Sequence, residues 1–429
     1  MEGRKTKVFL VVASLFILSF IPYDAILDYS IRTPIGVSRV VKDERRGYAE
    51  VPPLPVGWWT PWLESTSTIY QPLTAADPHS WCFPTKKSPQ VPPKNSPVRG
   101  LLFIKNHKAS SSTCAGVNMA IAHHVARRKF SLNGNTTDTV FCENYYRHYF
   151  HSQKKFAKHR ITEGGASLLW TFVRNPMSRD LSEVYHFQVT RGNLDPEKDA
   201  DRLLQGLQRV KGKQTRYLSL DHDDEWNIAG IENDEYETRR LWSTMLRQKI
   251  LEQYDFIGVT ERMAESLAVM TILWDLDPTD VIVLSAKQSS VSNGESYDDG
   301  RYQNTCFKMI PAPKNMSDLQ PSMAQYLQSK EYIERNPDFL LYYAAHKALD
   351  RTIEAIGRDK VAERTETIMK LQSLAEERCQ KEAIFPCSNE GIHQTELSEQ
   401  NCYWNDAGCG YACVDQVMSE FRGRQGKLT

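Results

Sequence analysis

The sequence lacks an excess of either charge. Its 429 residues include 53 Lys or Arg and 53 Asp or Glu, so the formal net charge is zero. Without bulk positive charge there is no general electrostatic attraction to nucleic acid, and we expect no nucleic-acid partner. Acidic residues are also missing from one stretch, between Arg99 and Thr137, which holds six Lys or Arg. That local bias favours an anionic ligand.

Two familiar motifs are absent as well. The phosphate-binding pattern GxxxxGK[ST] does not occur, because no glycine precedes Lys108 where that loop requires one. No CxxC pair occurs among the nine cysteines, which weakens a zinc interpretation of the C-terminal stretch CYWNDAGCGYAC. Disulfides therefore explain the cysteines better than a metal site does.

The sequence also has no long apolar run. Basic residues at positions 4, 5 and 7 precede an apolar segment over residues 8–23, which is shorter than the roughly 20 residues of a comfortable membrane span. A cleaved signal peptide is one interpretation, but no A-x-A-like cleavage site follows, which favours an uncleaved signal anchor. The positive residues keep residues 1–7 in the cytosol and send the rest of the chain into the lumen.

Cysteine usage agrees with an oxidising lumen. Residues 366–429 form a cysteine-rich extension, which we expect to be poor in helix and disulfide-bonded through Cys379, Cys387, Cys402, Cys409 and Cys413. The odd total of cysteines leaves at least one thiol unpaired, and Cys114 is the candidate for a buried free thiol.

Proline and then alternating apolar runs divide the rest of the chain. Residues 24–98 are rich in proline and read as an extended or irregular stem. From residue 99 to 365, the short apolar runs GLLFIK, TVFCENYY, SLLWTFVR and YDFIGVT alternate with segments of helical spacing. Strands separated by helices predict an α/β domain with a parallel sheet flanked by helices. Long helices are expected from Asp338 to Lys370, closing the domain.

The stretch FIKNHKASSSTCAG, residues 103–116, is the first that carries chemistry. A strand, a tight loop and a helix would place first-turn N–H groups at the carboxyl edge of the sheet, where they favour a phosphate or sulfate. Lys108 adds a positive charge. Hydroxyl donors follow it at Ser110, Ser111, Ser112 and Thr113. The competing interpretation is a cluster of helix-capping serines beside a surface lysine.

A second stretch, WTFVRNPMSRDLSEVYHF at residues 170–187, carries a matching pattern. Arg174 stands at the carboxyl end of a strand, and Ser182 follows eight residues later in the next helix. The planar guanidinium suits phosphate, and the serine could complete the grip. An arginine at a strand end is common in α/β proteins, so this stretch decides nothing alone.

Together the two stretches resemble the Golgi carbohydrate sulfotransferases. HKASSST is similar to the HKTGSST or PKTGST loop of that family, which binds the 5′-phosphosulfate of 3′-phosphoadenosine 5′-phosphosulfate (PAPS). VRNPMSRDLS is similar to the RDPxxRxxS element, which binds the 3′-phosphate. YDFIGVTERMAESLAVM resembles a strand and helix of galactose 3-O- and heparan sulfate 2-O-sulfotransferases. The resemblance covers residues 99–357, with Ala109 and Ser110 in place of Thr-Gly and Asn175 in place of Asp.

The resemblance implies a P-loop-like sulfotransferase fold and transfer of a sulfuryl group from PAPS to a glycan hydroxyl. It also implies a single-pass type II Golgi membrane protein. Lys108 would stabilise the leaving phosphate, so no metal is implied. The residues expected to bind PAPS are Lys108, Ala109, Ser110, Ser111, Ser112, Thr113, Arg174 and Ser182.

The general base is expected to be a histidine. In the related 2-O-sulfotransferases it lies about twenty-odd residues before the arginine, which makes His151 the first candidate and His148 the second. His159 would need a deletion, and the next alternatives are Glu143 or a carboxylate of the acidic loop at residues 221–226.

Two rival functions stay open. The loop DHDDEW, residues 221–226, contains the D-x-D pattern that holds Mn²⁺ in many Golgi glycosyltransferases, so a metal-dependent glycosyltransferase using a nucleotide sugar is one rival. A non-enzymatic lumenal glycan-binding protein is the other. Acceptor specificity lies in loops that vary on this fold, so the acceptor glycan is left open.

Overall fold

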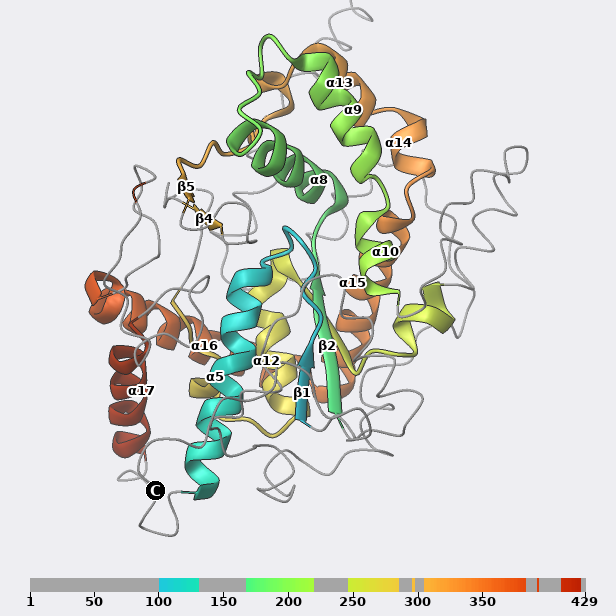
Figure 1. Ribbon diagram of the computed structural model, residues 1–429. Helices are drawn as coiled ribbons and strands as arrows, with labels where there is room; N and C mark the ends of the chain where they lie inside the picture. The colour runs from blue at the N-terminus through green and yellow to red at the C-terminus, as the bar shows by residue number, and fades with distance from the viewer. Residues whose placement is uncertain are drawn as a thin grey trace, which may run out of the picture.

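A small parallel sheet lies among many helices (Figure 1). The computed structural model describes residues 100–130, 167–219, 246–284, 295–297, 305–382, 392 and 410–425. The sheet has three strands in the order β1-β2-β3: Gly100–Phe103, Ser167–Val173 and Phe256–Val259. These confirm three of the expected strands, and the α/β class with them. The fourth expected strand, TVFCENYY, lies outside the described residues.

Each strand runs into a helix, as parallel pairing requires. α5 (Ser111–Phe130) follows β1, α8 (Pro176–Val184) follows β2, and α12 (Met263–Leu273) follows β3. The expected helix start at Pro176 is confirmed, and Asn175 caps it, because its side chain accepts the N–H of Ser178 at 3.2 Å. α8 then widens into the π-helix η6 (Tyr185–Thr190).

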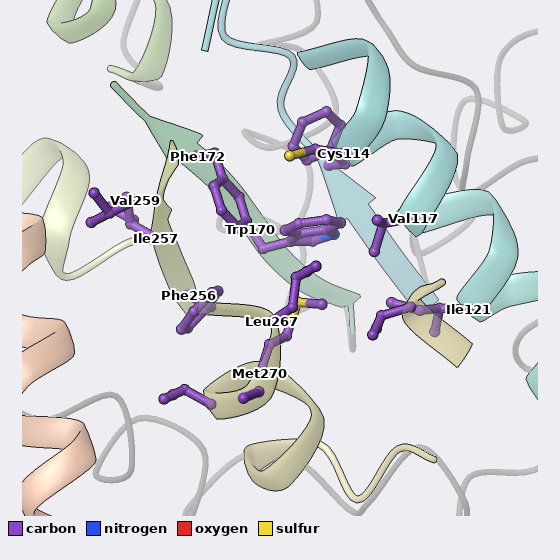
Figure 2. Close-up of a cluster of buried hydrophobic side chains, with 14 of the residues drawn as sticks. Cys114, Val117, Ile121, Trp170, Phe172, Phe256, Ile257, Val259, Leu267 and Met270 are labelled. Carbon is purple, nitrogen blue, oxygen red and sulfur yellow. The ribbon is translucent and has the colours of Figure 1, made fainter. Parts of the chain in front are cut away.

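The central strand β2 is buried on both faces. Leu169, Trp170, Phe172 and Val173 are all 0% exposed, which explains why the run SLLWTFV is apolar without alternation. Figure 2 shows Trp170 and Phe172 on the face covered by α5 and α12, and Ile257 points the other way. The helix α15 (Pro337–Ile356) packs against β2 and β3.

Packing between β2 and β3 leaves no room for a side chain at Gly258. Gly258 pairs with Phe172 across the strands, and a Cβ at this position would lie 2.4 Å from the Phe172 ring. Because a buried ring cannot withdraw as an exposed flexible side chain can, the close approach of these strands requires glycine.

A second hydrophobic cluster lies around α8 and η6. It gathers buried side chains of α8, η6, α9, α13 and α14, such as Val184, Leu207 and Met323. The bounds of these further helices are α9 Ala200–Val210, α10 Lys213–Leu218, α13 Pro321–Leu327 and α14 Lys330–Glu334. The remaining short elements are η8 Arg247–Leu251, η9 Thr260–Arg262, η10 Pro278–Val281, β4 Glu295–Tyr297, β5 Thr305–Phe307, η11 Met316–Asp318 and η12 Gln380–Glu382.

Most of the described residues in the C-terminal cysteine region are helical. α16 (Arg358–Cys379) runs without a break across residue 365, and α17 (Tyr411–Gln425) packs against it. The expectation of a helix-poor tail is therefore wrong for these residues. The segment forms a helix because its apolar residues Tyr411, Val414 and Met418 recur at helical spacing, and all three are 0–2% exposed. The expectation had relied on the number of cysteines and had not considered this spacing.

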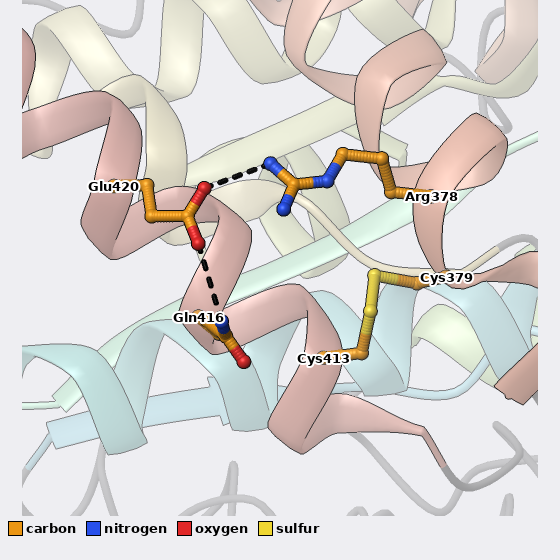
Figure 3. Close-up of a disulfide and its surroundings, with 5 residues drawn as sticks. All are labelled: Arg378, Cys379, Cys413, Gln416 and Glu420. Atoms are coloured by element: carbon orange, nitrogen blue, oxygen red, sulfur yellow. Dashed lines mark hydrogen bonds and ion pairs between the residues drawn. A yellow bond between two sulfur atoms is a disulfide. The ribbon is translucent and has the colours of Figure 1, made fainter.

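One disulfide joins the two C-terminal helices (Figure 3). Cys379, the last residue of α16, is bonded to Cys413 in the first turn of α17, which confirms disulfide bonding for two of the five clustered cysteines. The ion pair between Arg378 and Glu420, 2.8 Å long, spans the same two helices. Cys387, Cys402 and Cys409 lie outside the described residues.

Removing this disulfide should destabilise the protein measurably. The bond joins two residues with a sequence separation of 34. Such a link stabilises the folded state by roughly 2–4 kcal/mol, mainly because it restricts the unfolded chain. We expect the double substitution Cys379→Ser and Cys413→Ser to lower the free energy of unfolding by that amount in urea denaturation. Arg378→Ala is the matched control, because an exposed ion pair contributes little. An unchanged urea midpoint in the double variant would contradict the expectation.

The N-terminal expectations fall outside the described part of the chain. Residues 1–7, 8–23 and 24–98, expected to form the cytosolic tail, anchor and stem, all precede the first described residue. Among the helices that the structure describes, none combines the length and the apolar character needed to cross a membrane.

Candidate active site at the carboxyl edge of the sheet

The loop after β1 leads directly into the first turn of α5. The N–H of Ala109 donates to the carbonyl of Asn106 at 3.3 Å, which closes a tight turn, and the N–H of Cys114 donates to the carbonyl of Ser110 at 2.9 Å. The expected order of strand, tight loop and helix is therefore confirmed. Because first-turn N–H groups of a helix have no acceptor within it, those of Ser111, Ser112 and Thr113 are suited to an anion.

The side chains of this loop differ in access. Lys108, Ser110, Ser112 and Thr113 are half-buried, whereas Ser111 is 8% exposed. Ala109 is fully buried, so only its backbone could contact a ligand. The loop thus offers one lysine and several hydroxyl groups at partly accessible positions.

Two residues of the loop have a left-handed backbone. The φ angle is 62° at Lys108 and 53° at Ser110, in the region that glycine adopts without steric cost. Ser110 occupies the position at which the resembled sulfotransferase loop has glycine. The chain therefore keeps a left-handed backbone here without the residue that usually supplies it.

Glycine at this position should stabilise the protein. A non-glycine residue in the left-handed region costs roughly 1–2 kcal/mol, so we expect Ser110→Gly to raise the free energy of unfolding by about 1 kcal/mol. Ser112→Gly is the matched control, because this serine lies in the first turn of α5, where glycine should lower stability by up to about 1 kcal/mol. Urea denaturation of both variants measures the difference. A loss of stability in both would contradict the backbone argument.

Arg174 meets this loop from the end of β2. Its Nη1 donates to the carbonyl of Lys108 at 3.1 Å, so the structure brings the two sequence motifs together. Its own backbone is fixed by Gln214, which accepts the Arg174 N–H at 3.0 Å and donates to the Arg174 carbonyl at 2.9 Å. Ser182 lies in α8 with a half-buried side chain, and its part in holding phosphate stays a prediction.

Two amide side chains that the sequence did not single out tie the loops together. Asn106 Nδ2 donates to the carbonyl of Phe172 and to Gln214 Oε1, both at 2.9 Å. Gln214 is the second residue of α10, and its backbone N–H donates to the buried carboxylate of Asp338 at 3.0 Å. The loops after β1 and β2 are thus braced from α10 and α15.

Arg179 supports the loop from within the protein. It is 0% exposed, and its Nε donates to the carbonyl of His107 at 3.1 Å. It forms ion pairs with Asp180 at 2.7 Å and with Glu183, which Lys213 also contacts. A signal for this residue was present, because Arg179 is the second arginine of the RDPxxRxxS-like element. No role for Arg179 was predicted from the sequence.

The end of β3 adds a carboxylate to the same edge. Glu261, the second residue after the strand and part of η9, accepts the backbone N–H of Asn175 at 2.9 Å. Residues following all three strands therefore converge: Lys108, Arg174 and Glu261. The contact also occupies the Asn175 N–H, which is consequently not available to a ligand.

The candidate bases belong to segments that the structure does not describe. His148, His151, His159 and Glu143 lie outside the described residues, as does the acidic loop at 221–226. Among the residues that are described, no group of three or more His, Cys, Asp or Glu side chains is arranged to hold a metal ion.

Two α5 residues have structural roles. Cys114 is a free thiol, fully buried as expected, and burial raises its pKa. His124, also buried, lies between Asp415 at 2.8 Å and Asp280 at 3.5 Å. Burial lowers the pKa of His124, but hydrogen bonds to these carboxylates more than offset it, and the net shift is upward. The imidazole thereby joins α5, η10 and α17.

Comparisons of the chain with protein-family models, with curated proteins and with solved structures find no match in any of the three.

Proposed function

We propose that this chain is a PAPS-dependent carbohydrate O-sulfotransferase. The observation that carries the proposal is the hydrogen bond from Arg174 to the carbonyl of Lys108, which joins two motifs 66 residues apart at one helix N-terminus. A nucleotide with two separated anionic groups needs two such basic positions.

The described residues fit this donor. Lys108 and the first-turn amides of α5 would hold the 5′-phosphosulfate, and Arg174 with Ser182 would hold the 3′-phosphate. Ala109 would contribute its backbone, and Ser110 to Thr113 would add hydroxyl donors. Arg179, buried beneath the loop, would keep His107 and therefore Lys108 in place.

In the proposed reaction the acceptor oxygen attacks sulfur while the bond from sulfur to the bridging phosphate oxygen breaks. The negative charge that develops on the leaving phosphate would be stabilised by Lys108 and the α5 amides. The acceptor proton passes to a base, for which His151 and His148 remain the proposed residues. The same proposal includes a P-loop-like sulfotransferase fold, an N-terminal membrane anchor and a location in the Golgi.

Transfer of labelled sulfate to a glycan panel tests the proposal. The full chain is incubated with PAPS carrying radioactive sulfur, with and without EDTA, and labelled glycan is separated and counted. We expect label on at least one glycan and no loss with EDTA. Transfer from a nucleotide sugar that needs Mn²⁺ would favour a glycosyltransferase instead. Failure to bind adenosine 3′,5′-bisphosphate would overturn the proposal.

A further inference from the structure

Three half-buried aromatic side chains cluster beside the loop that carries Lys108. His107 immediately precedes that lysine, and its ring stacks on Phe187 with centroids 6.0 Å apart and an interplanar angle of 20°. Tyr217 meets His107 edge-on at 5.4 Å. We call His107, Phe187 and Tyr217 the aromatic cluster. It unites the loop after β1, the π-helix η6 and α10.

The fold fixes the aromatic cluster by the same contacts that fix the loop. The carbonyl of His107 is held by buried Arg179, and α10 is held by Asp338, which accepts the N–H of Thr215 at 2.7 Å. Phe187 projects from a π-helical turn, a rare geometry that occurs frequently at functional sites. The rings are therefore positioned relative to Lys108 and do not hang from an independent surface loop.

Three basic side chains border the aromatic cluster, and one of them is the buried Arg179, whose guanidinium lies 6.0 Å from the centroid of Tyr217. The Arg191 guanidinium lies 5.1 Å from the centroid of Phe187, and the Lys213 ammonium lies 5.5 Å from that of Tyr217. Lys213 is also paired with Glu183. Apolar ring surface bordered by a few polar groups is the usual lining of a small-molecule site.

Packing of the protein core does not account for this exposure. The aromatic residues of the sheet core, such as Trp170 and Phe256, are 0% exposed, whereas all three members of the aromatic cluster keep part of their surface accessible. Partly accessible rings next to a candidate reaction centre point to a ligand with an apolar face.

We propose that the aromatic cluster is the subsite for a pyranose ring of the acceptor glycan. This inference rests on the proposed sulfotransferase function. A pyranose presents C–H groups on its face, which pack on aromatic carbon, and hydroxyl groups at its rim, which Arg191 and Lys213 can meet as donors. Because His107 adjoins Lys108, a sugar bound here lies beside the sulfuryl group.

Adenine could also stack on aromatic rings, but the placement favours the sugar. In the proposed donor complex Lys108 contacts the phosphosulfate end of the nucleotide, and the adenine lies on the other side of the ribose. The aromatic cluster adjoins the phosphosulfate end through His107.

Saturation-transfer NMR on the full chain tests the subsite. The probes are methyl β-D-galactopyranoside, methyl β-D-glucopyranoside and the methyl glycoside of N-acetylglucosamine, each with adenosine 3′,5′-bisphosphate present. We expect saturation of the C–H protons of at least one probe, and a loss of affinity of roughly tenfold in Phe187→Leu. Phe421→Leu, a partly buried aromatic position of α17, is the matched control and should bind normally.

Calorimetry with adenosine 3′,5′-bisphosphate separates the outcomes. Unchanged nucleotide affinity in Phe187→Leu supports the sugar subsite, whereas a selective loss of nucleotide affinity would mean that the ring stacks on adenine and would overturn it. Absence of saturation in the wild-type chain, or equal effects in Phe187→Leu and Phe421→Leu, would overturn it too. Sugar binding that depends on Phe187 without any sulfate transfer would sink the proposed function and leave the subsite standing.

Discussion

Replacing Lys108 with alanine is expected to lower turnover by ~10²-fold or more, because the lysine would stabilise charge on the leaving phosphate, and losing one such donor typically has that effect. The interaction strengthens as the sulfur–oxygen bond breaks, so most of the loss should fall on kcat and little on KM for PAPS. Steady-state transfer of labelled sulfate at saturating donor measures it.

Two controls make the Lys108 result interpretable. Alanine tolerates the left-handed backbone no better than lysine, so Lys108→Ala should keep the fold, which circular dichroism can verify. Lys370→Ala removes an exposed lysine of α16 that is paired with Glu366, and it should leave turnover unchanged. A folded Lys108→Ala variant with near-normal turnover would exclude the lysine from the chemical step.

Replacing Arg174 with alanine should weaken binding of adenosine 3′,5′-bisphosphate by roughly 10- to 100-fold, since a hydrogen bond to a charged group contributes about 1.5–3 kcal/mol. The same substitution should hardly change the affinity for adenosine 5′-phosphate, which lacks the 3′-phosphate. Calorimetric titration of both nucleotides against wild type and variant gives the selectivity directly.

Arg174 also has a structural contact, and the two nucleotides distinguish the roles. Its Nη1 donates to the carbonyl of Lys108, so alanine removes a support of the loop together with any phosphate contact. Equal losses for the two nucleotides would mean that Arg174 acts only through the loop. Arg378→Ala, which removes an exposed arginine paired with Glu420, is the control for the loss of one positive charge.

The parts of the fold and site that were predictable follow from short-range rules. Strands buried on both faces have uninterrupted apolar runs. The runs GLLFIK, SLLWTFVR and YDFIGVT therefore predicted β1, β2 and β3 in turn. Parallel strands end at one edge of a sheet, which is why Lys108 after β1 and Arg174 after β2 lie near each other.

The remaining contacts have no local signature. Asn106 reaches Gln214 across 108 residues, and Gln214 reaches Asp338 across 124, so neither periodicity nor a motif could indicate them. Phe187 enters the aromatic cluster because α8 widens into a π-helix, which the 3.6-residue pattern does not encode. Helix α17 was not predicted, because the clustered cysteines around it are typical of an irregular, disulfide-bonded tail.

The covered position of Cys114 has a practical consequence. Because this thiol is the free cysteine among the described residues and is 0% exposed, reagents in solution can alkylate it only when the structure around it opens. The rate of alkylation thus reports how often the structure around the first turns of α5, next to the Lys108 loop, opens. A ligand that binds the loop only in the closed state should slow alkylation, so mass spectrometry of the Cys114 peptide could rank nucleotides without any assay of catalysis.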